Sequence, residues 1–187
     1  MSKRRSLFNE IKATQVACLL LKLNGGEMDF AKCIKLIYSI ERESLNRWLR
    51  PVIYDELYSL PYGQVVSNTL DKAEYQQQKA TSFWTEHIEN YDRKNLRLVK
   101  ECGREKLSRA EIKLIEEIYE QNRNKTAKQL FDEHHDPKLF PEYKDPHNSS
   151  IQTTYADLLK ILGKTKEQIQ EFESDLDALE HLKALQG

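Results

Sequence analysis

Apolar residues recur every three or four positions along much of this 187-residue chain, and glycines, prolines and capping residues divide them into separate segments. This spacing predicts amphipathic helices. In residues 9–26 it indicates a buried helix, which Gly25 ends in a left-handed conformation. Asp29 then opens a second helix that stops at Pro51, because the residue before a proline leaves the helical region.

Helical spacing continues in the rest of the chain, and we expect helices within residues 66–84, 107–121, 127–135 and 154–162. Ser108 and Glu111 form a capping box, in which each side chain bonds a backbone amide of the other residue. Thr126 has the position of a cap for the helix that follows it. A last helix, over residues 166–185, carries an apolar stripe at three- and four-residue spacing. The stripe consists of Ile169, Phe172, Leu176, Leu179 and Leu182.

Residues 88–91 and 96–99 differ from the helical segments, since they flank an Asp-Arg-Lys-Asn turn and predict a short β-hairpin. Residues 136–150 contain three prolines and predict a long polar loop, either packed on the surface or functional. The predicted fold is therefore mainly α, a compact helical domain with one small β-hairpin. We expect residues 1–164 to form this domain and residues 165–187 to add the amphipathic helix.

Composition limits the class of protein. The formal net charge is −1, so the chain as a whole does not favour nucleic acid, although its first residues, MSKRRS, are basic enough to touch a phosphate. No apolar run approaches the length of a membrane span, and the start lacks the features of a secretion signal. Three widely spaced cysteines indicate reduced thiols. We expect a soluble, cytoplasmic protein with no membrane partner.

The sequence GKT at residues 163–165 resembles the end of a phosphate-binding loop. The full motif needs another glycine five residues earlier, where Leu158 stands, and a strand rather than a helix before it. Gly163 instead suits the end of one helix, and Thr165 with Gln168 suits the capping box of the next.

The sequence DEHHD at residues 132–136, with His147 nearby, contains residue types that bind metals. Its spacing fits no zinc pattern, because adjacent histidines point to different sides of a helix. We interpret it as a helix end where His134 and His135 meet exposed carbonyls. The chain also lacks a nucleophile elbow and a local cysteine–histidine signature. We expect no enzyme, no metal site and no cofactor.

An aromatic turn between residues 54 and 66 stands out. It contains Tyr54, Tyr58 and Tyr62, and Pro61 and Gly63 allow the chain to reverse there. Tyrosine rings can pack while their hydroxyl groups remain available to water or a partner. Two interpretations stay open: a crossover that bridges two helices in the core, or a binding surface.

Several motifs across residues 10–162 resemble the Panacea family, also called the SocA-like antitoxins. The helix 107–121 and the sequence QLFDEHHDP at residues 129–137 match elements of this family. The chain departs from the pattern at Gln64, where the family has a proline, and at Ile40-Glu41, where it has Ala-Asp. The remaining matching motifs are Lys35-Leu36-Ile37-Tyr38, Glu41-Arg42-Glu43, Leu45, Arg50-Pro51-Val52, Tyr54-Asp55 and Leu60-Pro61-Tyr62-Gly63-Gln64-Val65.

This resemblance implies an antitoxin that neutralises a toxin encoded beside it by direct protein contact, without implying which toxin. One alternative is an adaptor that hands a client to an ATP-dependent protease, or a phage protein acting on host machinery. Another is a DNA-binding autorepressor that uses the basic start. The near-neutral charge places that reading behind the others, and an enzyme last.

For an antitoxin, aromatic and arginine side chains around the turn are the expected contacts, since Tyr, Trp and Arg dominate interface energetics. Part of this set must belong to the core, and we expect Trp48 to be its most buried member. The C-terminal stripe is a second candidate surface, which packs on the domain, forms a homodimer or binds the toxin. The predicted contacts are Arg47, Trp48, Tyr54, Asp55, Tyr58 and Tyr62.

Overall fold

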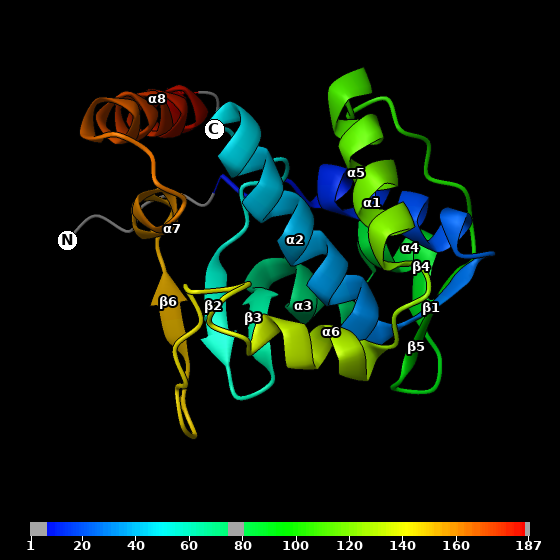
Figure 1. Cartoon of the computed structure of the whole chain (residues 1–187). Helices are drawn as coiled ribbons and strands as arrows, with labels where there is room; N and C mark the ends of the chain where they lie inside the picture. The colour runs from blue at the N-terminus through cyan, green and yellow to red at the C-terminus, as the bar shows by residue number, and fades with distance from the viewer. Residues whose placement is uncertain (1–6, 75–80, 186–187) are drawn as a thin grey trace.

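The computed structural model describes residues 7–74 and 81–185. Eight helices and six short strands alternate along this part of the chain (Figure 1). None of these helices is long and apolar enough to cross a membrane. The helices are α1 (Glu10–Leu23), α2 (Phe30–Trp48), α3 (Ser67–Ala73), α4 (Phe83–His87), α5 (Arg109–Asn122), α6 (Ala127–His134), α7 (Tyr155–Ile161) and α8 (Lys166–Leu185). The strands are β1 (Glu27–Asp29), β2 (Leu57–Leu60), β3 (Gly63–Val66), β4 (Ile88–Asn90), β5 (Asn95–Leu98) and β6 (Ile151–Thr153).

Helix α2 is the centre of the fold and packs against α1, α5, α6, α7 and strand β3. In Figure 1 it runs diagonally between α5 on one side and the α7–α8 pair on the other. Its apolar side chains and those of α1 are buried together in one core. Both helices begin as expected, with the carboxylate of Asp29 accepting a hydrogen bond from the Lys32 amide at 2.9 Å. The sequence prediction of two long buried helices is confirmed.

Two three-stranded antiparallel sheets, ordered β1-β5-β4 and β3-β2-β6, flank this helical centre. The predicted hairpin is confirmed as β4–β5, with Ile88 opposite Leu98. The prediction of a mainly α fold with one small hairpin is wrong, because the fold is mixed α and β. Strands β1 and β6 span three residues each and pair with distant partners, as Ser59 does with Ile151. Such short strands carry too few residues to show an alternating pattern.

The helix boundaries follow the predicted capping chemistry. Capping boxes join Ser108 with Glu111 and Thr126 with Gln129. Gly163 ends α7 with φ +75°, and Thr165 bonds Gln168 before α8. Residues 136–150 form the predicted loop without helix or strand. Of the helix predicted over residues 66–84, the structure describes α3 and α4 as separate elements, and residues 75–80 lie outside the described residues.

Helix α8 packs against α7 through the first part of its apolar stripe. Ile169 and Phe172 are buried, with 7% and 5% of their surfaces exposed. Farther along, Leu179 is 39% exposed and Leu182 is 56% exposed. The stripe therefore anchors the helix at its start and faces solvent toward its end.

Candidate functional site

The aromatic turn is the tip of the β2–β3 hairpin, and a buried lysine holds it. Lys35 Nζ donates hydrogen bonds to the carbonyl oxygens of Tyr62 at 2.6 Å and Gln64 at 2.8 Å. Burial lowers the pKa of Lys35 to about 7. Gly63 lies between the two carbonyls with φ +91°, and a Cβ atom there would lie 2.7 Å from Lys35 Nζ. The lysine and glycine of the motif are therefore one structural device that fixes the turn.

The histidines of the DEHHD sequence pack behind this turn. His134 is buried and stacks on Phe140 with ring centroids 4.0 Å apart, and burial lowers its pKa so that the imidazole is neutral. His135 Nδ1 lies 2.7 Å from the Phe131 carbonyl oxygen, which agrees with the predicted contact at a helix end. Within residues 7–74 and 81–185, no group of three or more His, Cys, Asp or Glu side chains is arranged to hold a metal ion.

A second buried network ties the long loop to α2. The carboxylate of Glu142 is fully buried and accepts hydrogen bonds from Arg42 Nε at 2.6 Å and from the Tyr38 hydroxyl at 3.1 Å. The guanidinium of Arg42 also lies over the ring of Phe140, 5.1 Å from its centroid. Tyr38 and Arg42 thus have structural partners on the loop, and sequence reasoning missed Glu142 because it lies 100 residues beyond Arg42.

Asp55, one of the predicted contacts, is only 1% exposed and holds the start of α3. Its carboxylate accepts from the backbone amides of Asn68 and Thr69 at 2.8 and 2.9 Å, and from the Thr69 hydroxyl at 2.6 Å. The carbonyl oxygen of Asp55 accepts a hydrogen bond from the Tyr155 hydroxyl at 2.5 Å. Asp55 thereby fastens both α3 and α7 to the segment that follows α2.

The structure spreads the other predicted contacts over several places. Tyr62 is 75% exposed at the hairpin tip, whereas Trp48 is 39% exposed at the end of α2, so the expectation that Trp48 is the most buried is wrong. Arg47 forms ion pairs with Glu43 at 2.7 Å and with Glu117 at 2.6 Å.

The end of α2 and the hairpin tip are separate surfaces. Lys35, which contacts Tyr62, lies twelve residues before Arg47 on α2, which places the two about 18 Å apart along the helix axis. Between these places lie the half-buried Tyr54, which has φ +56°, and the half-buried Tyr58, whose hydroxyl donates to Glu56 at 3.4 Å.

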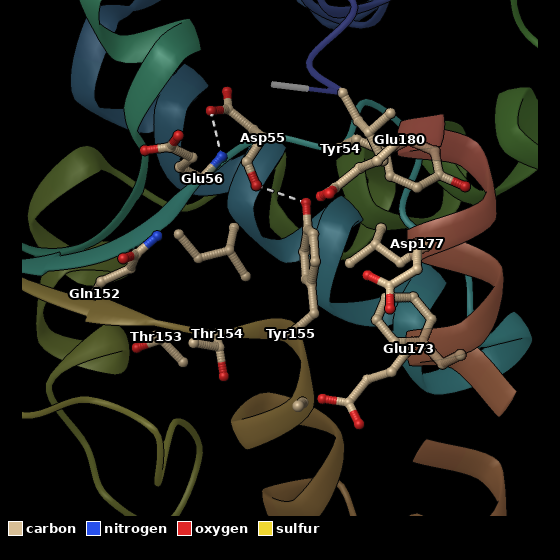
Figure 2. A pocket seen from close by; sticks show the side chains of 15 residues that line it. Tyr54, Asp55, Glu56, Gln152, Thr153, Thr154, Tyr155, Glu173, Asp177 and Glu180 are labelled. Carbon is tan, nitrogen blue, oxygen red and sulfur yellow. Dashed lines mark hydrogen bonds between the residues drawn. The ribbon is translucent and has the colours of Figure 1, made fainter. Parts of the chain in front are cut away.

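Tyr54 and Asp55 line a cavity of about 580 Å³, which we call the acidic groove. Its walls are the start of β2, strand β6, the start of α7 and one face of α8. Figure 2 shows Tyr155 at its centre with the hydroxyl directed toward Asp55, and Glu173, Asp177 and Glu180 on the α8 side. Burial raises the pKa of Tyr155 well above its ordinary value, with Glu41 and Asp55 adding to the effect.

Sequence reasoning identified the apolar stripe of α8 but missed its acidic face. Glu173, Asp177 and Glu180 follow one another at four- and three-residue spacing and all line the acidic groove. This spacing is visible in the sequence and places the three carboxylates on one side of a helix. What the sequence does not show is that this side faces Tyr54 and β6.

The comparisons with known proteins give one match. The sequence model described as "Antitoxin SocA-like, Panacea domain" matches residues 34–139. No curated protein and no solved structure matches the chain. The matched range contains Lys35, Gly63 and His134, whose side chains and backbone meet behind the hairpin tip. The match covers more than half of the chain, which therefore belongs to the SocA-like antitoxin family that carries the Panacea domain.

Proposed function

We propose that this protein is the antitoxin of a toxin–antitoxin pair and neutralises a toxin encoded beside it by direct protein–protein binding. Membership of the SocA-like antitoxin family carries this proposal. The toxin is the partner that such a family member requires.

The surface that supports this role is the rim around the structural networks. Tyr62 and Trp48 expose large aromatic area, and Tyr54 and Tyr58 are half-buried between them. Aromatic side chains held by a rigid scaffold contribute much of the binding energy at protein interfaces, because little entropy is lost when they bind. Arg47, held by its two ion pairs, adds a charged contact beside Trp48. We leave Asp55 out of the proposed contacts, since its carboxylate is buried against α3.

The test is co-expression of the tagged protein with the product of the adjacent gene. We expect the neighbour to arrest growth when expressed alone, to be harmless in the presence of this protein, and to co-purify with it in a fixed ratio. A neighbour that does not affect growth and forms no complex would overturn the proposal. Relief of toxicity that requires an ATP-dependent protease and lowers the amount of toxin would favour the adaptor instead.

The proposed contacts are tested in the same assay. Tyr62→Ala removes an exposed ring and leaves the backbone carbonyl that Lys35 binds, so we expect a normal melting temperature and weaker binding. Tyr58→Ala is the companion variant on β2. If both variants fold and still bind as tightly as the unaltered protein, the toxin contacts a different surface.

A further inference from the structure

The acidic groove has charges of one sign only. Its lining includes the carboxylates of Glu56, Glu173, Asp177 and Glu180, and none of the residues that line it is Lys, Arg or His. Like charges three and four residues apart on one helix face destabilise that helix by their mutual repulsion. A cation that enters the groove relieves this repulsion, so the groove favours a basic occupant.

The floor of the groove is aromatic and apolar. Tyr54, Tyr155 and Phe172 contribute rings, and Tyr155 meets Phe172 edge to face with centroids 5.9 Å apart and an angle of 83° between the planes. Leu57 and Leu176 add aliphatic surface. A guanidinium group can stack on an aromatic face and pair with a carboxylate through two parallel hydrogen bonds. Rings and carboxylates in one cavity therefore suit arginine better than a compact ammonium ion.

The volume of the groove limits the shape of the occupant. Two turns of a helix about 10 Å wide and about 11 Å long fill roughly 900 Å³. The groove holds about 580 Å³, which is less than such a helix needs. The occupant is therefore a short extended stretch, or a few side chains that project from one face of a larger element.

We propose that the acidic groove binds a short arginine-containing segment of the toxin, with guanidinium groups between the α8 carboxylates and the rings of Tyr54 and Phe172. This inference rests on the proposed function and adds the chemistry of the toxin segment and its place on the antitoxin. It also explains why an antitoxin of near-neutral charge gathers carboxylates on this face of α8.

The test measures affinity for the purified product of the adjacent gene by calorimetry. The double variant Glu173→Lys/Asp177→Lys reverses two charges in the groove, and Glu116→Lys/Glu171→Lys reverses two exposed charges outside its lining, on α5 and on the other face of α8. We expect about tenfold weaker binding or more for the groove variant, because like charges then face each other. The control variant is expected to bind within about twofold of the unaltered protein. Circular dichroism checks that both variants fold.

The outcomes separate the two proposals. If the unaltered protein binds no neighbour product, the proposed function fails and this inference with it. If the unaltered protein binds and the groove variant binds equally well, or if both double variants lose affinity alike, only the inference about the groove is overturned. A photo-crosslinking residue in place of Leu176 gives an independent readout. Cross-links to an arginine-containing toxin peptide support the proposal, and cross-links only to residues 1–6 of the same chain overturn it.

Discussion

Lys35 Nζ lies 2.6 Å from the carbonyl oxygen of Tyr62, so a buried ammonium group on α2 holds the tip of the β2–β3 hairpin in place. The tip exposes the ring of Tyr62 while its backbone is fixed from behind. The aromatic turn is thus structural on its inner side and available to a partner on its outer side. Both interpretations of this stretch apply, each to a different part of it.

Gly63→Ala tests the inner side of the turn. The backbone of Gly63 has φ +91°, and the added Cβ would lie 2.7 Å from Lys35 Nζ and 3.1 Å from His135 Cε1. Lys35 cannot move aside without losing its two carbonyl contacts. We expect the free energy of unfolding to fall by about 3 kcal/mol, from backbone strain together with the displaced lysine. Urea denaturation followed by circular dichroism measures this loss.

Gly25→Ala is the matched control for this variant. Gly25 has φ +84°, close to that of Gly63, but no atom lies within 4 Å of an added Cβ. We expect a loss of only about 1 kcal/mol, from backbone strain alone. Equal losses at the two glycines would show that the contact with Lys35 has no energetic weight.

Asp55→Ala is expected to destabilise the fold although Asp55 belongs to no regular element. Its carboxylate is the cap of α3, because it accepts from the backbone amides of Asn68 and Thr69. Removing a buried charged acceptor leaves several donors without a partner, so we expect a loss of about 3 kcal/mol. Asp29→Ala, which removes a single capping bond to Lys32, should lose about 1 kcal/mol. Thermal unfolding compares the two variants, and a smaller loss for Asp55→Ala would contradict this role.

The predictability of this fold depends on how local the signal is. Ser108 with Glu111 and the β4–β5 hairpin could be predicted because all partners lie within a few residues of one another. Strand β6 could not, because its pairing with β2 joins Ser59 to Ile151 across 92 residues and no periodic pattern marks it.

The candidate site shows the same division. The family motif drew attention to Tyr54, Asp55 and Tyr62, but their opposite roles depend on which side chains turn inward. Asp55 is 1% exposed and Tyr62 is 75% exposed, and both residue types occur in cores and in interfaces. The acidic groove was missed because its walls come from β2, β6 and α8, which meet only in the folded chain.

Stability should depend on pH through Glu41. Burial raises the pKa of this carboxyl to about 8 and nearby Asp55 adds to the shift, against the hydrogen bond that the Ile53 amide donates at 2.6 Å. The folded state therefore keeps a proton that the unfolded state releases above about pH 4.5. The stabilisation is complete below that pH and is lost as the pH rises toward 8, with a slope of at most about 1.4 kcal/mol per pH unit.

Glu41→Gln isolates this effect from other groups. Lys35 and His134 have lowered pKa values and oppose the trend, but they are present in both proteins and cancel in the difference. We expect the free energy of unfolding of the unaltered protein, minus that of Glu41→Gln, to decrease steadily between pH 5 and pH 8. Urea titrations at several pH values measure it. A difference that stays constant over this range would mean that Glu41 is ionised in the folded state.

Phe172→Ala and Leu182→Ala separate the two halves of the α8 stripe. Phe172 is 5% exposed and packs edge to face on Tyr155, so its truncation should cost about 3 kcal/mol and release α8 from α7. Leu182 is 56% exposed, and its truncation should change stability by less than about 0.5 kcal/mol. Thermal melts and helical ellipticity measure both effects. Because Leu182 adds nothing to folding on this account, any loss of toxin binding in Leu182→Ala reports a direct contact. Comparable destabilisation by the two variants would instead show that the end of the stripe is covered by the protein's own surface.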